Sequence, residues 1–277
     1  MTKDITIVAV DTYAHDLTRI AIERTLGVLP CQEVLVLSDK NIYPAGRWVD
    51  INPIGIEEYS KIMLKHLWPF IRTEHILVIQ YDGMAIDANN WTDDFLNYDY
   101  IGASWPWAHH PPGFKVGNGG FSLRSRRLLN MLKSKEVVED VKYPHYEDLY
   151  IGVHYKQHLT EQGAVIADVA VANKFSTEFP PGKKDTFGFH GCFNIPYYLG
   201  ETDAVKFMEL MPAWTSEGAV MMIPHCFAAG NPLLGQLGLE LARITNPAID
   251  QRVKQTLQEI PELRYSPHIT KLYSLLK

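Results

Sequence analysis

The first 40 residues alternate strand, helix and strand, and this pattern restricts the chain to folds built on a parallel sheet. Residues 5–10 (ITIVAV) and 33–37 (EVLVL) are short aliphatic runs, as in strands that are buried on both faces. Between them, residues 15–26 have helical spacing, and Gly27 and Pro30 end that helix. A strand, a helix and a second parallel strand form a right-handed crossover. The chain is therefore predicted to have an α/β fold.

Later segments continue this alternation. Residues 56–70 have apolar residues at helical spacing, and residues 75–80 (HILVIQ) predict a third buried strand. Residues 126–133 and a segment that starts near Tyr146 predict two more helices. The apolar segment Ala164–Ala172 (AVIADVAVA) predicts a further strand. Together these segments predict a mixed, mainly parallel sheet that is flanked by helices.

The character of the sequence changes after about residue 200. Residues 203–211, 233–244 and 248–259 have helical periodicity, and no good strand follows. We therefore predict two domains, an α/β domain over 1–200 and a helical C-terminal extension over 201–277. The predicted linkers of the extension carry Pro212, Pro224, Pro232 and Pro247.

The composition and cysteine spacing argue against several functional classes. The formal net charge of −6 and pI of about 6.0 argue against a nucleic-acid partner. The three cysteines are far apart and form no CxxC pair, which argues against a structural zinc site or disulfide framework. The N-terminal residues turn polar too quickly for a signal peptide, and no run of 18 apolar residues occurs. We expect a cytoplasmic protein that reaches any lipid-linked substrate peripherally at the inner membrane; the sequence leaves the oligomeric state open.

Polar residues follow the third predicted strand. Gln80, Tyr81 and Asp82 lie where ligands collect in open α/β sheets, beyond the carboxyl ends of the strands. A carboxylate there can bind Mg²⁺ or Mn²⁺ together with a diphosphate. The alternative is that Asp82 only caps the turn before Gly83.

A glycine-rich segment, residues 116–124 (VGNGGFSLR), follows. Gly119 and Gly120 would let the backbone pass close to a ligand, although an ordinary hairpin also contains such glycines. The segment matches neither GxGxxG in a strand-to-helix setting nor a Walker A sequence, so it does not support a dinucleotide or ATP site.

Two further motifs carry titratable groups. Glu147 and Asp148 lie at a predicted helix start and suit a general base with a neighbour that holds the acceptor, or only a favourable charge at a helix N-terminus. His190, in the segment FGFHG, suits a metal ligand or a buried, hydrogen-bonded histidine. The adjacent His109 and His110 suit one metal poorly, but they are able to hydrogen-bond a sugar.

The order of these motifs resembles that of GT-A glycosyltransferases, which have a Rossmann-like sheet. GNGGFSLRS resembles the loop of galactosyltransferase-like inverting enzymes, and Glu147-Asp148 resembles their ED motif. The QYD segment stands where such enzymes carry DxD, with Gln80 in place of the first aspartate. Residues 5–195 more closely resemble a bacterial family of uncharacterised glycosyltransferase-like proteins.

The resemblance implies a role for each motif. Asp82 would bind Mn²⁺ or Mg²⁺ with His190 as a second ligand, and Asp148 would be the general base while Glu147 orients the acceptor. Gly119 and Gly120 would let the sugar or acceptor approach the backbone. The nucleotide-sugar donor would lie near Val10, Asp11, Thr12, Ser38, Asp39, Gln80, Tyr81, Asp82, Gly119 and Gly120.

The resemblance therefore implies a hexosyltransferase of polysaccharide biosynthesis that inverts, as inferred from the ED motif; a retaining course, with an α-linked product from an α-linked donor, stays open. Its donor would be a nucleotide sugar, by family habit a UDP-hexose, and its acceptor a hydroxyl of a glycan or lipid-linked glycan. Three alternatives stay open. A metal-free enzyme would use Lys115, Lys183 or Lys184 against the diphosphate, an inactive binding protein would explain Gln80, and a sugar-nucleotide pyrophosphorylase would need a glycine- and lysine-rich loop where VAVDTYAHD stands.

Overall fold

The computed structural model describes residues 2–105, 115–133, 146–212, 214, 217–260, 262–263 and 266–277. The chain divides into two compact units, unit 1 (Met1–His190) and unit 2 (Gly191–Lys277). The assignment of 1–200 as a catalytic domain and 201–277 as an extension stays a prediction.

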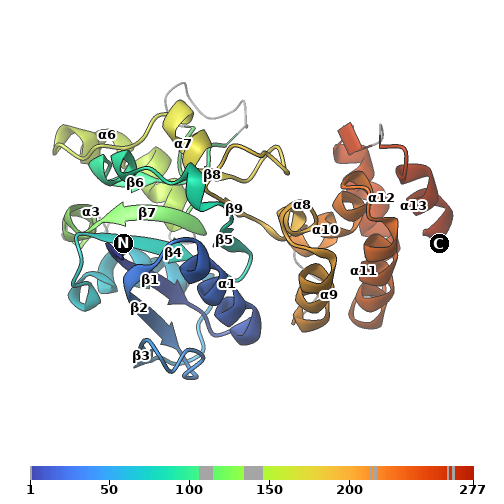
Figure 1. Ribbon diagram of the computed structural model, residues 1–277, viewed down its shortest axis with the longest axis horizontal. Coiled ribbons are helices and arrows are strands. Elements are labelled where there is room, and N and C mark those ends of the chain that lie inside the picture. The colour runs from blue at the N-terminus through green and yellow to red at the C-terminus, as the bar shows by residue number, and fades with distance from the viewer. Residues whose placement is uncertain are drawn as a thin grey trace. The chain divides into compact units, whose positions relative to one another are not determined.

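Unit 1 is built on a six-stranded sheet in the order β3-β2-β1-β4-β7-β6 (Figure 1). The first four of these strands run parallel, and β7 is antiparallel to both of its neighbours. This arrangement confirms the predicted α/β fold with a mixed, mainly parallel sheet. The strands are β1 (Lys3–Val10), β2 (Cys31–Ser38), β3 (Arg47–Asp50), β4 (His75–Ile79), β6 (Tyr100–Ile101) and β7 (Phe121–Ser125).

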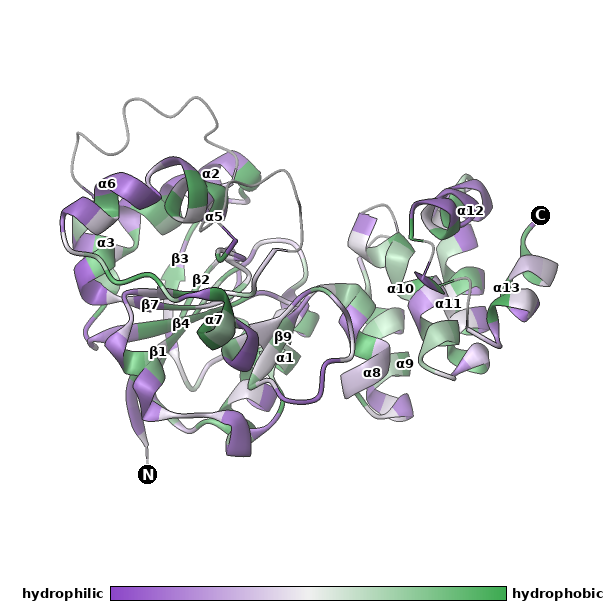
Figure 2. Ribbon diagram, turned by 90° about the horizontal axis from the view of Figure 1, so that it is seen from above, coloured by the Kyte–Doolittle hydropathy of each residue, from purple (hydrophilic) through white to green (hydrophobic). Residues whose placement is uncertain are grey.

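Helices cover both faces of this sheet. On one face, Val8 of β1 and Val78 of β4 are buried under Tyr59, Met63 and Leu67, which come from α2 (Ile56–Lys61) and the turns after it. The opposite face is covered by α1 (His15–Val28), and Figure 2 shows α1 and α2 on opposite sides of the sheet. Because both faces are buried, the central parts of β1, β2 and β4 are mostly aliphatic rather than alternating.

A second, three-stranded sheet joins distant parts of unit 1. Its order is β5-β9-β8, from β5 (Gly83–Ala85), β9 (Gly188–His190) and β8 (Ser176–Thr177). The pairing of β5 with β9 places Gly83 opposite His190. A short strand that follows Asp82 is thereby held beside the strand that ends in His190.

The remaining helical segments of unit 1 are short. The predicted strand Ala164–Ala172 is wrong, since its second half lies in α7 (Val169–Phe175). Asp168 begins that helix, because its side chain accepts a hydrogen bond from the backbone N–H of Val171. The others are α3 (Arg126–Leu132), α5 (Glu147–Leu149), α6 (Lys156–Glu161), the π-helical turns Ile62–His66 and Tyr150–His154, and the 3₁₀ turns Trp68–Phe70, Ala88–Asn90 and Asp93–Asn97.

All described secondary structure of unit 2 is helical. Pro224, which the sequence analysis places in a linker, lies inside α10 instead; Ala219 to Phe227 are all buried there, so packing outweighs the cost of a proline in a helix. Within the described residues, no helix is both long and apolar enough to cross a bilayer. The helices are α8 (Ile195–Tyr198), α9 (Glu201–Leu210), α10 (Glu217–Ala228), α11 (Pro232–Thr245), α12 (Ile249–Glu259) and α13 (Ile269–Leu275), with a 3₁₀ turn at Cys192–Asn194.

Candidate active site at the sheet edge

The predicted site residues follow the ends of neighbouring strands. Asp11 follows β1, Asp39 follows β2 and Gln80 follows β4, and these three strands are parallel, so the residues lie at one edge of the sheet. Because β7 is antiparallel to β4, its first residue Phe121 pairs with Ile79 at that same edge. The residues just before β7, Gly117–Gly120, which we call the glycine loop, therefore lie at the same edge as the ends of β1, β2 and β4.

His190 is the centre of a cluster of polar side chains at this edge. Its Nε2 atom lies 3.0 Å from Gln80 Oε1 and 3.5 Å from Asp82 Oδ1. Its Nδ1 atom lies 3.0 Å from Asn118 Nδ2 and 3.3 Å from Glu178 Oε1. Burial lowers the pKa of His190, but the carboxylates of Asp82 and Glu178 outweigh it and raise this pKa to about 9. The structure thus brings Asp82 and His190 together, as the sequence analysis expects of metal ligands.

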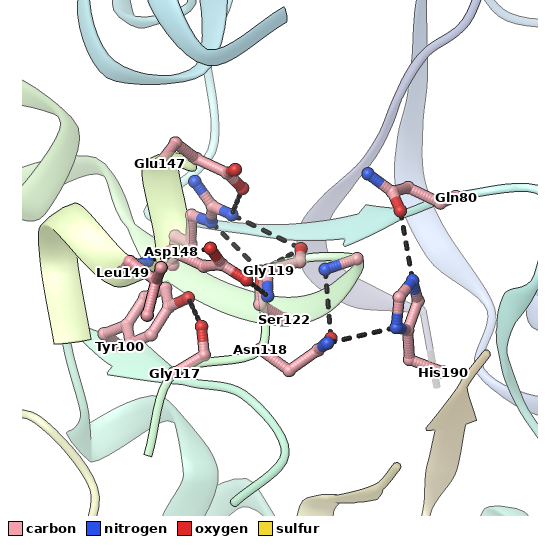
Figure 3. Close-up of polar contacts among 12 residues, drawn as sticks. Gln80, Tyr100, Gly117, Asn118, Gly119, Ser122, Glu147, Asp148, Leu149 and His190 are labelled. Carbon is pink, nitrogen blue, oxygen red and sulfur yellow. Dashed lines mark hydrogen bonds and ion pairs between the residues drawn. The ribbon is translucent and has the colours of Figure 1, made fainter. Parts of the chain in front are cut away.

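The glycine loop runs between the His190 cluster and the Glu147-Asp148 pair (Figure 3). The Gly119 N–H donates to Asp148 Oδ2 (3.2 Å) on one side. On the other side, a Cβ atom on Gly120 would lie 2.1 Å from His190 Nε2. The glycines are therefore required because the protein's own side chains approach the loop from both sides; room for a sugar stays a prediction.

Asp148 has the surroundings of a proton acceptor. Its Oδ1 accepts a hydrogen bond from the Leu149 N–H (2.7 Å), and its side chain is only partly exposed. Burial and the negative charge of Glu147 raise the pKa of Asp148 to about 7. A carboxylate whose pKa is close to neutrality suits general base catalysis at physiological pH.

Glu147 differs sharply from its neighbour. It is 4% exposed, and its Oε1 accepts a hydrogen bond of 2.7 Å from Nη2 of Arg124, which is fully buried. The two adjacent acids therefore have different electrostatic surroundings, one with a paired cation and one without.

The edge next to β1 and β2 carries further predicted donor residues. Asp11 Oδ1 accepts hydrogen bonds from the N–H groups of Tyr13 and Ala14, whereas its buried Oδ2 has no partner within the described residues. His15 Nε2 lies 2.7 Å from Asp39 Oδ1, and this contact lowers the pKa of Asp39. Whether Asp11 Oδ2 accepts a hydrogen bond from a nucleotide stays a prediction, because the atom is buried in this structure.

The other residues predicted to lie near the nucleotide sugar have contacts within the protein. Val10 is buried in the core, Thr12 Oγ1 accepts from the Ile54 N–H, and Ser38 Oγ accepts from the Lys40 N–H. These three residues shape the edge, and their contact with a nucleotide stays a prediction.

Tyrosine rings connect this edge to the QYD turn. Tyr13 follows β1 and is 54% exposed, and its ring centroid lies 6.4 Å from that of Tyr81. An exposed aromatic ring at the ends of the strands is a suitable surface for a planar group such as a nucleobase.

Several residues of the site are absent from the sequence-based prediction. Asn118 and Arg124 lie inside the glycine-rich motif, so their position in it was the available signal. Glu178 and Tyr13 lie in loops without a motif, and only the fold shows their place. Two of the lysines that a metal-free enzyme would use are described as follows: Lys183 donates from Nζ to the Asn173 carbonyl (2.8 Å), and Lys184 is exposed. His109 and His110 lie outside the described residues.

The cluster around His190 contains side chains of the types that bind divalent cations. His190 Nε2 lies 3.5 Å from Asp82 Oδ1 and 3.0 Å from the Gln80 amide oxygen. In the described part of the chain, no group of three or more His, Cys, Asp or Glu side chains that could hold a metal ion is found. Metal binding by Asp82 and His190 stays a prediction.

The chain was compared with curated proteins and with solved structures. No curated protein matches the sequence. The solved galactosyltransferase LgtC, in complex with donor and acceptor sugar analogs, is 14% identical with a TM-score of 0.45, over 88% of this chain and 98% of that chain. The mannosyltransferase PcManGT from Pyrobaculum calidifontis, in complex with GDP-Man and Mn²⁺, is 10% identical with a TM-score of 0.44, over 99% and 79% of the two chains. The bifunctional IspDF from Campylobacter jejuni is 11% identical with a TM-score of 0.38 over 60% of this chain, and the match spans about half of IspDF, 49% of its length.

The family comparison covers the site itself. The matched segment, residues 50–190, includes the QYD turn, the glycine loop, the Glu147-Asp148 pair and His190. Because the match spans about half of the chain, the protein belongs to the family described as "Protein of unknown function (DUF5672)".

Proposed function

We propose that this protein is a glycosyltransferase that moves a hexose from a nucleotide sugar, in the first instance a UDP-hexose, to a hydroxyl of a glycan or lipid-linked glycan. The observation that supports it best is the arrangement around the glycine loop. Asp148, with a pKa near 7, lies on one side, and Asp82, His190 and Gln80 lie on the other. A base and a diphosphate-binding group on two sides of one loop are what a sugar transfer requires.

The donor nucleotide would lie over the ends of β1, β2 and β4. The Asp11 carboxylate would accept a hydrogen bond from the base or ribose, and the exposed ring of Tyr13 would stack on the base. The Asp39 carboxylate, held by His15, would contact the same nucleoside. These contacts would direct the diphosphate toward Asp82 and His190.

Asp82 and His190 would hold a Mn²⁺ or Mg²⁺ ion, with Gln80 as an additional oxygen ligand. When bound, such an ion neutralises the charge that develops on the leaving diphosphate. The proton on His190 has to leave before its Nε2 atom binds a metal, so metal affinity should increase with pH.

Asp148 would act as the general base of an inverting displacement. It accepts the proton of the acceptor hydroxyl while the oxygen forms a bond to the anomeric carbon. The bond from that carbon to the diphosphate breaks, and the nucleoside diphosphate leaves with the electron pair. The Leu149 and Gly119 N–H groups hold the two carboxylate oxygens, so Asp148 has a fixed orientation in the complex.

The direct test is nucleotide release from a donor panel. The protein is mixed with UDP-glucose, GDP-mannose, dTDP-rhamnose and CMP-sialic acid, with and without Mn²⁺, and free nucleotide is measured. We expect Mn²⁺-dependent release from one donor that is lost in Asp82→Asn and kept in Asp94→Asn, an exposed aspartate away from the site. Binding of a donor without release would favour the inactive binding protein, and neither binding nor release from any donor would overturn the proposal.

The pH profile of release provides a further prediction. A base works only in its ionised form, and the pKa of Asp148 is raised to about 7. We therefore expect kcat/KM to rise about tenfold per pH unit below pH 7 and to level off above it. Glu147→Gln should move this limb to lower pH, because the charge of Glu147 contributes to the raised pKa of Asp148. A profile that is flat from pH 5 to 8 would contradict the assignment of Asp148 as base.

A further inference from the structure

Arg124 is the most deeply buried charged residue of the site. It lies on β7, is fully inaccessible to solvent, and its guanidinium carbon lies 5.4 Å from the centroid of the Tyr100 ring. Its Nε donates to Ser122 Oγ (3.0 Å), and its Nη2 donates to Glu147 Oε1 (2.7 Å) and to the Gly119 carbonyl (3.3 Å). A single side chain thus connects the glycine loop to the start of α5.

The backbone of Gly119 is the link between Arg124 and the proposed base. Its carbonyl, in the peptide group with Gly120, accepts hydrogen bonds from Arg124 and from Ser122 Oγ (2.9 Å). Its N–H, in the peptide group with Asn118, donates to Asp148 Oδ2 (3.2 Å). A Cβ atom at residue 119 would lie 2.3 Å from Glu147 Oε1, so the acid fits only because the residue is glycine. Arg124 and Asp148 thus contact the two peptide groups on either side of the Gly119 Cα atom.

Stability alone does not explain a buried ion pair here. Removing two charges from water has a large cost, and hydrophobic pairs of similar volume are often as stable or more so. Arg124 also keeps its Nη1 atom buried without a partner in the described part of the chain, which adds to that cost. The charges therefore require a reason other than stability.

We propose that Arg124 is a positioning residue for Asp148. It pairs with Glu147 as its counter-ion and fixes the Gly119 carbonyl, and thereby the backbone of Gly119, whose N–H in turn donates to the base. Glu147 then serves Arg124 rather than the acceptor, which leaves Asp148 as the acid of the pair that reaches substrate. The inference rests on the proposed glycosyltransferase function.

The first test separates positioning from binding. Nucleotide release with the four donors is measured for Arg124→Met, Arg124→Lys and the surface control Arg19→Met. We expect Arg124→Met to lower kcat roughly 100-fold, as for a misplaced catalytic group, with donor KM within about threefold of wild type. Arg124→Lys should recover part of kcat, because an ammonium replaces the charge but not the fork of donors.

A double variant keeps the test valid if Arg124→Met is too unstable to study. Arg124→Met/Glu147→Met removes both charges and should fold at least as stably as wild type. We expect its kcat to stay low, because the Gly119 carbonyl then loses the hydrogen bond from Arg124 and keeps the one from Ser122 Oγ. Recovery of wild-type kcat in the double variant would overturn the proposal, since Arg124 would then only neutralise Glu147.

Hydrogen exchange of the Gly119 amide provides a readout that needs no substrate. We expect this amide to be protected in the wild-type protein, and to exchange at least about tenfold faster in the double variant than in Arg19→Met. If the wild type releases no nucleotide but Gly119 exchange accelerates, the proposed function fails while the positioning of Asp148 by Arg124 is upheld. Unchanged exchange in the double variant would contradict the positioning itself.

Discussion

Asp148→Asn should lower the rate of sugar transfer by roughly 10²–10⁴-fold, the contribution of a general base. An amide has nearly the shape of the carboxylate and can still accept a hydrogen bond from the Leu149 N–H, but it cannot take a proton from a hydroxyl. Donor KM should change little, because Asp148 acts on the acceptor. The measurement is kcat and KM for the donor that the panel identifies.

The matched control for this variant is Asp94→Asn, in which an NH₂ group likewise replaces one carboxylate oxygen, but on an exposed aspartate. The Asp148→Asn protein should keep its fold by circular dichroism, because burial and the charge of Glu147 disfavour ionised Asp148 more than the Leu149 and Gly119 N–H groups favour it. Folded Asp148→Asn with wild-type kcat at pH 8 would remove Asp148 from the mechanism.

Gly120→Ala should damage both the fold and the polar cluster around His190. Its Cβ would lie 2.1 Å from His190 Nε2 and 2.7 Å from Gln80 Oε1. His190 has little room to move, because Asn118 and Glu178 contact its other ring nitrogen. We expect a loss of about 1–3 kcal/mol in the free energy of unfolding, the usual cost of overpacking, together with weaker Mn²⁺ binding. Urea unfolding and a Mn²⁺ titration measure the two effects.

Gly27→Ala is the control for this substitution. Gly27 lies in α1, and an added Cβ there would meet nothing within 4 Å. Alanine should stabilise the helix by up to about 1 kcal/mol, since glycine is a poor helix former. If Gly120→Ala binds Mn²⁺ as tightly as Gly27→Ala does, the cluster around His190 is not the metal site.

The main sheet was predictable because its strands are buried on both faces. The runs at 5–10, 33–37 and 75–80 are mostly aliphatic, and a signal of this kind does not depend on neighbouring segments. Elements that depend on tertiary packing were not predicted correctly. Strand β3 and the proline-containing α10 were missed, and the segment 164–172 was assigned to a strand although Asp168 caps a helix within it.

The site was predictable to the extent that residues follow strand ends. Asp82 and His190 come together because β5 and β9 pair, and that proximity agrees with the order of motifs. The role of Arg124 was not accessible, since a charged residue in a short strand usually points to solvent. Its burial depends on Glu147 and Gly119, which are brought close only by the complete fold.

The pairing of β5 with β9 also bears on the order in which the parts of unit 1 would form during synthesis. All strands of the six-stranded sheet lie within the first 125 residues, so this sheet can assemble while the chain is still emerging from the ribosome. His190 contacts Gln80 across 110 residues of sequence, and β9 is the last element of unit 1. In a nascent chain the six-stranded sheet would therefore form before the candidate site is complete. The slow, long-range pairing of β5 with β9 would then bring His190 to Gln80 and Asp82.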